Sequence, residues 1–304
     1  MTPPLASVAV PAYNHARYIG ACLESIRDQT YPELELVVVD DGSTDGTGDA
    51  VQRFAREHGN RFRRVEFIRQ ENRGVGAASN RAIAACRGEW VHLLGSDDRL
   101  YPHKIEAQWR AIRDWGDERL ALVYADADLI DEDGAVIPKV AGERPPSGPD
   151  PEAYLSLVLG NPIPNPTVAL HRERFASSGG FDESLRLEDW DCWLRLATGY
   201  TLARVPERLA AYRRHGANAS LRQAMMLQES WIILGRFFER HGELIPPALA
   251  RASFRRRLRS FRRWARKNAP ALLPGILWDT VRAWVRAPEP AWFDRYASLC
   301  DTRN

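Results

Sequence analysis

The chain has 304 residues, of which 44% are hydrophobic and 27% are charged. These proportions exclude a disordered or fibrous chain and suit one large or two modest globular domains. Lysine and arginine together number 42 against 40 acidic residues, which gives a net charge of +2. A charge this small gives no field that would indicate a nucleic-acid partner, and we expect none.

Four scattered cysteines form no C-x-x-C pair: Cys22, Cys86, Cys192 and Cys300. This spacing argues against a zinc ribbon and a disulfide framework, and it indicates a reducing compartment. Residues 1–10 lack the basic start and the apolar run of a signal peptide, and no apolar stretch has the length of a membrane span. We therefore expect a cytoplasmic protein.

Short apolar runs alternate with longer amphipathic stretches through residues 1–125. This alternation predicts β-α units around a mostly parallel sheet flanked by helices. The predicted strands are 7–10, 34–39, 64–68, 90–94 and 120–124. The predicted helices begin near Ala16, Asp45, Gly74 and Pro102. In such a sheet the ligand binds beyond the carboxyl ends of the strands, so the loops that follow the strands carry the candidate site.

The chain after residue 126 departs from this alternation. It predicts a hairpin around 131–134, a Pro/Gly-rich loop over 142–151, a strand over 167–170 and a helix through 190–197. From about residue 221 to the end we expect mostly helices.

Two predicted strands each deliver a pair of acids to a loop. Asp40 and Asp41 follow one strand, and Asp97 and Asp98 follow another. Acids at one sheet edge repel each other by about 1 kcal/mol or more per close pair, and a divalent cation relieves that repulsion. Mg²⁺ or Mn²⁺ takes carboxylate oxygens and keeps coordination sites for phosphate, which indicates a phosphate-bearing ligand. The alternative is a capped turn at the first pair and a solvated loop at the second.

The loop after the first predicted strand reads Pro11-Ala12-Tyr13-Asn14. The Tyr13 ring offers a face on which a nucleotide base can stack, while Asp41 can accept a hydrogen bond from that base. The alternative places Tyr13 at the edge of the core.

A segment at Arg73-Gly74-Val75-Gly76 resembles a truncated G-x-G-x-x-G fingerprint. It follows the third strand rather than the first, and Ser79 stands where the last glycine belongs, so a dinucleotide site is poorly supported. Glycines at a helix N-terminus still let an anion approach. Arg73 then either pairs with phosphate or is a solvated charge.

Three carboxylates cluster at the start of a predicted helix, in Glu188-Asp189-Trp190-Asp191. The helix carries an apolar stripe at i, i+3, i+4 and i+7: Trp190, Trp193, Leu194 and Ala197. Acids favour helix N-termini in any case, which is the alternative to a catalytic role. Asp189 lies at the edge of the stripe, where it can face a cleft and take a proton from a hydroxyl.

Taken together, these segments resemble glycosyltransferase family 2, the nucleotide-sugar-dependent transferases of the GT-A fold. The resemblance covers residues 5–220, and its pieces are Pro-x-Tyr-Asn at 11–14, the acidic run from Asp40, Asn72-Arg73-Gly74 leading into Ala78-Ser79-Asn80, Ser96-Asp97-Asp98, and Glu188-Asp189-Trp190-Asp191. It implies an α/β GT-A fold, with a Rossmann-like nucleotide-sugar-binding half over 1–125. An acceptor-binding and catalytic-base half follows over 126–220. The chain then ends in a helical, basic C-terminal extension over 221–304.

The resemblance also implies roles. Tyr13 and Asp41 would hold the base, usually uracil in relatives, with Pro11, Asn14 and Arg73 beside the nucleotide. Asp97 would touch the ribose or the sugar, and Asp98 would ligate Mn²⁺ or Mg²⁺ on the diphosphate. Asp189 would be the catalytic base, with Glu188 and Trp190 on the acceptor side. His215, in a family-like segment at 212–220, is either a further metal or phosphate contact or a surface residue.

These roles imply an inverting, metal-dependent enzyme. It moves a sugar from a nucleotide diphosphate donor, of the UDP type, to a hydroxyl of a glycan or lipid-linked acceptor in bacterial surface polysaccharide or glycan assembly. Two other functions remain open. A sugar nucleotidyltransferase would need a Gly-rich basic loop where residues 11–14 lie. A non-catalytic nucleotide-sugar- or glycan-binding module would not need the acidic residues predicted to bind the metal and to act as the base, all of which are present.

Residues 244–278 contain no acid and nine basic residues. Among them Phe254, Leu258, Phe261 and Trp264 recur at helical spacing, which is typical of an amphipathic helix. This helix either packs on its neighbours with a solvated arginine face or docks on an anionic membrane surface, where each basic residue adds about 1 kcal/mol. Docking would make the protein peripheral on the inner face of the cytoplasmic membrane. RNA binding lacks a recognition motif.

Overall fold

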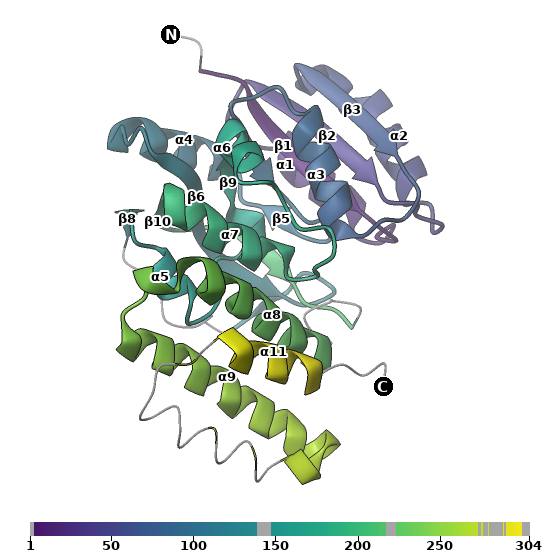
Figure 1. Cartoon of the computed structure of the whole chain (residues 1–304). Coiled ribbons are helices and arrows are strands. Elements are labelled where there is room, and N and C mark those ends of the chain that lie inside the picture. Colours follow the sequence, from purple (N-terminus) through teal and green to yellow (C-terminus); the bar gives the residue numbers. More distant parts are fainter. Residues whose placement is uncertain are drawn as a thin grey trace. The chain divides into compact units, whose positions relative to one another are not determined.

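The computed structural model describes residues 3–138, 147–216, 223–272, 275, 279, 288 and 290–299 (Figure 1). Two predicted segments lie partly outside the described residues. These parts are residues 142–146 of the loop predicted over 142–151 and residues 217–220 of the 212–220 segment.

The chain divides into two compact units. The sheet unit comprises Met1–Pro151, Pro162–Ser184 and Gly199–His215, and the helical unit comprises Glu152–Asn161, Leu185–Thr198 and Gly216–Asn304. This is a division by packing. The division by function into residues 1–125, 126–220 and 221–304 stays a prediction.

The sheet unit is built on one ten-stranded sheet with the strand order β3-β2-β1-β4-β9-β6-β10-β5, in which β7 also pairs with β6 and β8 with β10. β1 to β4 pair in parallel, as do β6 and β10, while β5, β7, β8 and β9 run antiparallel to their neighbours. The strands are β1 Ala6–Ala12, β2 Leu34–Asp40, β3 Arg64–Arg69, β4 Trp90–Leu93, β5 Arg99–Leu100, β6 Leu120–Ile130, β7 Val136–Ile137, β8 Gly148–Asp150, β9 Ala169–His171 and β10 Thr201–Arg213. The predicted α/β sheet with flanking helices is confirmed, and the first four strands pair in parallel as expected, but the sheet as a whole is mixed because β5, β7, β8 and β9 join it antiparallel. The predicted hairpin joins β6 to β7.

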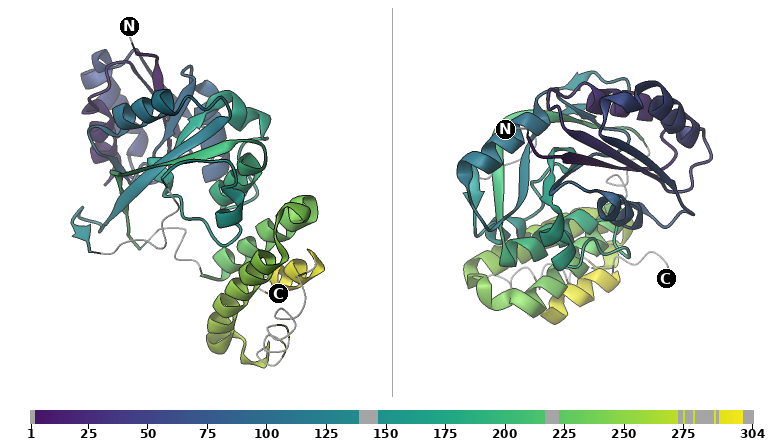
Figure 2. Two further views of the ribbon diagram at one scale, coloured as in Figure 1. Left: turned by 90° about the vertical axis from the view of Figure 1, so that its left-hand side faces the viewer. Right: turned by 90° about the horizontal axis from the view of Figure 1, so that it is seen from above.

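Helices cover both faces of the part of the sheet formed by β1, β2 and β3 (Figure 2). The helices of this unit are α1 Ile19–Arg27, α2 Thr47–His58, α3 Val75–Ala85, α4 Lys104–Trp115 and α6 Arg172–Ser177. β2 is buried along its whole length because α1 and α2 pack on one face and α3 on the other. Since successive strand residues face opposite sides, Leu36 and Val38 join the core beneath Leu23 and Val51.

The longest strand, β10, is not predicted by the sequence. Pro206 lies inside it, and proline within an apolar run argues for an edge or a bulge because it lacks an N–H. The register of β10 against β6 shifts between Val205 and Arg208, and the residues there are exposed, so the strand passes the proline by a bulge. β10 then continues beside β5 to Arg213 and leads into His215, at the edge where the β4 loop also lies.

The helical unit contains α5 Tyr154–Leu157, α7 Glu188–Gly199, α8 Gln223–His241, α9 Pro247–Asn268 and α11 Pro290–Leu299. The prediction of a helical C-terminal region is confirmed over the described residues, where α8, α9 and α11 lie side by side (Figure 1). The apolar residues predicted for α9 are all buried. Of these, Phe254 packs against Trp231 of α8 and Phe293 of α11, and Phe261 packs against Tyr296 of α11. The apolar side of α9 is therefore a packing face. None of the helices described here has the length and apolar character that crossing a membrane requires.

A fully buried carboxylate, Glu35, ties neighbouring strands of the sheet together. It accepts hydrogen bonds from the Ser7 hydroxyl of β1, from the Arg64 guanidinium of β3 and from the N–H of Arg87. Burial opposes ionisation of Glu35, but these three donors together outweigh burial and lower its pKa below the ordinary value.

We expect Glu35→Gln to lower the free energy of unfolding at pH 7 by about 2 to 3 kcal/mol, because buried donors lose a charged partner. The folded pKa is lower than the unfolded one. The contribution is therefore complete above the unfolded value of 4.5 and is lost as the pH falls through the folded pKa. Urea unfolding of the wild type and the variant at pH 7 and in acid measures both effects. Exposed Glu118→Gln is the control, and a Glu35 variant with the wild-type midpoint at pH 7 would contradict the prediction.

Candidate active site

The loops that follow β1 and β2 are fastened to each other by Asn14. Its N–H donates to Ser43 Oγ at 2.9 Å, and its Oδ1 accepts from the N–H of Thr44 at 2.9 Å. Among the described residues, Asn14 alone combines a side chain with a positive φ, +51°, which asparagine adopts more readily than most residues. Tyr13, just before it, is 47% exposed, which excludes the alternative that places this ring in the edge of the core.

Asp41 holds the loop that follows β3. Its buried carboxylate accepts three hydrogen bonds, from Gln70 Nε2 at 2.8 Å, from the N–H of Arg73 at 2.9 Å and from the N–H of Gly74 at 2.8 Å. A carboxylate offers about four lone-pair positions, so one remains for a ligand. The Arg73 guanidinium is 67% exposed and pairs with Glu183 at 3.0 Å.

Asp40, the other acid of this pair, is fully buried within the sheet unit. Its Oδ1 accepts from the N–H of Ser43 at 3.0 Å, and its Oδ2 lies 3.6 Å from Arg69 Nε. Asp40 therefore shapes the loop that carries Asp41.

A carboxylate and two imidazoles meet at the carboxyl edge of the sheet. Within the described ranges, His15, Asp97 and His215 are the one group of ligand-type side chains close enough to share a metal ion, with one ligand atom of each within 4.8 Å of the others. His215 Nε2 lies 2.9 Å from Asp97 Oδ2, and the two imidazole rings pack edge to face at 5.6 Å. Burial lowers the pKa of His15 below its ordinary value, so its ring is neutral at pH 7 and able to ligate a metal.

Asp98 is buried beside this group. Its Oδ1 accepts from the N–H of Arg213 at 2.7 Å, and burial, followed by the charge of Asp97, raises the pKa of Asp98 well above its ordinary value. Gly95 makes room for both acids, because a Cβ there would lie 2.9 Å from Asp97 Oδ1 and 3.0 Å from Asp98 Oδ2. The Arg213 guanidinium is fixed on backbone carbonyls, including that of Asp97 at 2.7 Å, and places a positive charge beside the two acids.

A second set of acids lies in the helical unit, at the start of α7. Asp189 is half-buried; its Oδ1 accepts from the N–H of Trp190 at 2.6 Å and its Oδ2 accepts from Asn161 Nδ2 at 3.0 Å. Glu188 is 6% exposed, and among the described residues its Oε2 has no hydrogen-bond partner. The two adjacent acids therefore have very different surroundings.

These surroundings separate the pKa values of Glu188 and Asp189. Burial raises the pKa of Glu188 well above its ordinary range, and the neighbouring charge of Asp189 adds to the rise. Burial raises the pKa of Asp189 to about 6, and the hydrogen bonds from Trp190 and Asn161 limit the rise. The charged form is therefore disfavoured more strongly for Glu188 than for Asp189, whose pKa of about 6 still lies below neutral pH.

The other members of the cluster make internal contacts. Asp191 is buried and forms an ion pair with Arg195, four positions further along α7, at 2.8 Å. Trp190 is 3% exposed; its Nε1 donates to the carbonyl of Leu157 at 2.9 Å, and the Arg257 guanidinium lies 4.7 Å from its ring centre. Both side chains are therefore occupied in holding α7 within its unit.

Comparison with known proteins identifies the family. A model described as glycosyl transferase family 2 matches residues 7–118. The chain is 31% identical over 232 residues to an uncharacterized glycosyltransferase of Rickettsia typhi, across 75% of this chain and 70% of that protein. The chain belongs to glycosyltransferase family 2. The transferase is also 33% identical over 235 residues to chondroitin synthase of Escherichia coli, across 75% of this chain but 31% of that protein's length.

Solved structures share the fold of the transferase. TarS 1–349 of S. aureus, solved with UDP-GlcNAc, has a TM-score of 0.64 and 19% identity, covering 98% of this chain and 88% of TarS 1–349. The mannosyltransferase PcManGT of Pyrobaculum calidifontis, solved with GDP-Man and Mn²⁺, has a TM-score of 0.60 and 20% identity, covering 99% and 87%. The GT-A fold implied by the sequence motifs is confirmed.

The structure gathers the predicted site residues of the transferase into two sets. In the sheet unit the loops of Tyr13 and Asn14 adjoin that of Asp41, and Asp97 meets His215. Pro11 lies inside β1, opposite Val39. In the helical unit Glu188, Asp189 and Trp190 lie together at the start of α7. The roles assigned to these residues stay predictions.

His15 is the residue that the sequence analysis missed. It follows Tyr13-Asn14 directly, and its one signal is its place in a loop at the carboxyl edge of the sheet. With His15 included, the group offers one carboxylate oxygen and two imidazole nitrogens, a donor set that fits a divalent transition-metal ion such as Mn²⁺ better than Mg²⁺.

Proposed function

We propose that this glycosyltransferase moves a sugar from a nucleoside diphosphate donor to an acceptor hydroxyl with inversion at the anomeric carbon. The observation that carries the proposal is the contrast between two adjacent acids: burial raises the pKa of Glu188 well above its ordinary range, whereas hydrogen bonds from Trp190 and Asn161 limit the pKa of Asp189 to about 6. A carboxylate with a pKa near 6 is suited to take a proton from a hydroxyl at neutral pH.

Asp189 accepts the proton of the acceptor hydroxyl as that oxygen attacks the anomeric carbon. In the same displacement the bond from that carbon to the diphosphate breaks, and the nucleoside diphosphate leaves with the bonding electrons. A single displacement inverts the carbon and needs no nucleophilic side chain. Glu188 and Trp190 act on the acceptor side by flanking Asp189, the latter through the N–H that holds Oδ1.

The donor nucleotide is proposed to bind at the ends of β1, β2 and β3. Tyr13 offers an exposed ring for stacking, and Asp41 offers one remaining acceptor position. One position suits the single N–H on the pairing edge of uracil better than the two donors of guanine, which supports a UDP-type donor. TarS with UDP-GlcNAc and PcManGT with GDP-Man show that this fold accommodates either base. Pro11, Asn14, Arg73 and Asp97 line the same edge in this proposal.

A divalent cation, Mn²⁺ in preference to Mg²⁺, is proposed beside the diphosphate. His15, Asp97 and His215 would hold it, while Asp98 is the ligand that the sequence predicts. When bound, such a cation supplies the positive charge that offsets the leaving diphosphate.

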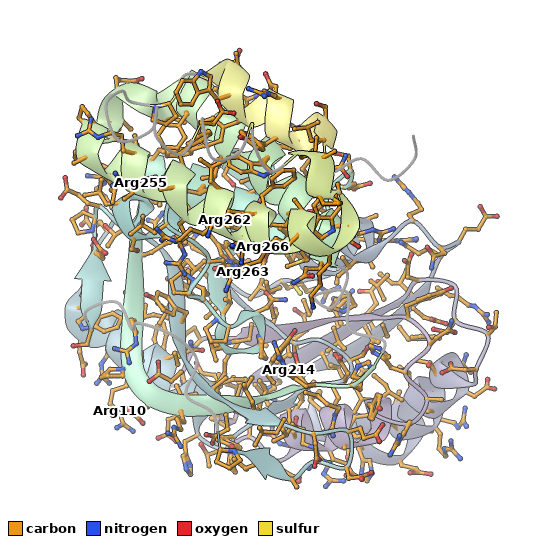
Figure 3. All side chains as sticks on the ribbon, turned by 90° about the horizontal axis from the view of Figure 1, so that it is seen from below. Arg110, Arg214, Arg255, Arg262, Arg263 and Arg266 are labelled. Atoms are coloured by element: carbon orange, nitrogen blue, oxygen red, sulfur yellow. The ribbon has the colours of Figure 1, made fainter. Side chains whose placement is uncertain are left out.

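The acceptor is proposed to be a glycan or a lipid-linked molecule in bacterial surface polysaccharide assembly, a proposal that the chondroitin synthase relative supports. The enzyme would act in the cytoplasm, peripherally on the inner face of the membrane. α9 carries exposed basic residues opposite its packed apolar face, and Figure 3 shows four arginines along this helix: Arg255, Arg262, Arg263 and Arg266. Because the apolar face is covered, charge alone would mediate this docking.

Asp189→Asn keeps the size of the side chain but cannot accept a proton. We expect turnover to fall by about 10² or more with donor affinity nearly unchanged, since the carboxylate acts mainly in the transition state. Asp191→Asn is the matched control, and we expect its main effect on stability because it breaks the Arg195 pair. Donor dissociation constants and turnover with a competent acceptor measure both. An active Asp189→Asn beside an inactive Asp191→Asn would rule out Asp189 as the base.

Asp97→Asn and Asp98→Asn form a second matched pair, one sequence position apart. We expect Asp97→Asn to weaken Mn²⁺ binding by about 10-fold or more, and Asp98→Asn by less, because Asp97 faces the two histidines. Mn²⁺ paramagnetic resonance in the presence of UDP gives both affinities. A loss confined to Asp98→Asn would assign the metal to Asp98 instead.

Replacing four exposed α9 arginines with glutamine should reduce binding to anionic vesicles at low salt by about 10-fold or more, since each basic residue near such a surface contributes about 1 kcal/mol. The four are Arg256, Arg259, Arg263 and Arg266. The control removes the same charge from exposed positions of the sheet unit, Arg53, Arg56, Arg113 and Arg119. Vesicle sedimentation measures binding, and equal loss in the two variants would mean that α9 has no special role.

A further inference from the structure

The two oxygens of the Asp189 carboxylate are held by donors from different parts of the helical unit. Oδ1 accepts from the N–H of Trp190 within α7, and Oδ2 accepts from Asn161 Nδ2, at 3.0 Å. Two donors on opposite oxygens fix the plane of a carboxylate and still leave each oxygen a lone pair for a hydroxyl.

The segment just before Asn161 is fixed through three successive carbonyl groups. The carbonyl of Leu157 accepts from Trp190 Nε1; those of Val158 and Leu159 accept from two buried side chains of α9, Ser253 and Arg257. α9 therefore anchors the residues that lead into Asn161.

The start of α7 is fixed independently. Glu229 of α8 is 8% exposed, and its Oε2 accepts from the N–H groups of both Arg186 and Leu187 at 2.7 Å. The hydrogen bond between Asn161 and Asp189 thus joins two segments that other contacts already hold in place, so little conformational freedom is lost when it forms.

We propose that Asn161 is a positioning residue of the transferase, which orients the Asp189 carboxylate toward the acceptor hydroxyl. The inference rests on the proposed function, because it takes Asp189 as the base. Asn161 itself is exposed, whereas the donors that anchor its segment are buried. An exposed amide adds little to stability, so its contribution lies in the direction and ionisation of the carboxylate it contacts.

The proposal predicts a titration signature that a purely structural role would not give. An amide N–H favours the ionised form of the carboxylate it contacts, so its removal raises the pKa of Asp189, and a carboxylate in its place raises it further. We expect Asn161→Ala to raise the pKa of Asp189 by about 1 unit and Asn161→Asp to raise it by more. Ser156→Ala is the matched control, because it removes a hydrogen bond to the carbonyl of Ala153 without removing a donor to Asp189.

Carbon-13 resonance of the full chain labelled only at aspartate carboxyls follows this titration without any ligand, and Asp189→Asn assigns the signal. In parallel, hydrolysis of UDP-GlcNAc with Mn²⁺ gives kcat and KM against pH. A pKa that rises in the order Asn161→Ala then Asn161→Asp, with lower kcat at pH 7, unchanged KM and a silent Ser156→Ala, supports the proposal.

The proposal would be overturned if Asp189 had the wild-type pKa in both Asn161 variants. An equal loss of kcat in Ser156→Ala would overturn it as well. In either case an inactive Asp189→Asn would leave the proposed function standing. An active Asp189→Asn would instead remove the base assignment, and the positioning role with it.

Discussion

Parallel pairing brings the ends of β1, β2 and β4 to one edge, and the repulsion among the acids collected there is the constraint that the sheet unit must meet. Asp41 accepts hydrogen bonds from two backbone N–H groups, and Asp98 accepts one from the N–H of Arg213, whose guanidinium charge also favours the ionised form of Asp98. Asp97 meets an imidazole instead, that of His215. The role of each acid thus follows from its partners rather than from its place in the motif. Asp41 and Asp98 bind backbone N–H groups, whereas Asp97 lies among side chains of the kind that bind metals.

In the helical unit, too, the surroundings rather than the sequence position distinguish two acids that are adjacent in the chain, Glu188 and Asp189. Asp189 has two donors, which limit its pKa to about 6, whereas burial raises the pKa of Glu188 well above its ordinary range. Burial is the largest cause of both shifts, and one of the two donors that limit the rise for Asp189, Asn161, lies outside α7. The pKa of Asp189 therefore depends on the segment that ends in Asn161, which α9 anchors.

The elements that the sequence predicts well are those whose signal is local. Strand runs and helical periods reveal β1 to β4 and the helices between them, because each pattern lies within one element. The sequence does not predict β10, because Pro206 interrupts the apolar pattern of this strand. The bulge that accommodates the proline is defined only by the pairing of β10 with β6. Asn161 contacts Asp189 across 28 positions, and no periodicity links them. The acid motif at Asp97-Asp98 predicts a metal ligand and the family resemblance assigns it to Asp98, whereas the structure groups Asp97 with the two histidines, because the direction of each acid depends on packing against Gly95.

The amphipathic pattern of the basic helix α9 predicts an apolar face but does not predict what covers that face. The structure shows that α8 and α11 cover this face. Arg257 departs from the pattern: it is 8% exposed, and burial lowers its pKa to about 10, so it is still charged at neutral pH. Its charge lies over the Trp190 ring and it donates to the carbonyl of Leu159. A chain cut ahead of α9 would strip both the tryptophan beside Asp189 and the segment that ends in Asn161 of their support, so this basic helix is an integral part of the helical unit rather than an appendage to it.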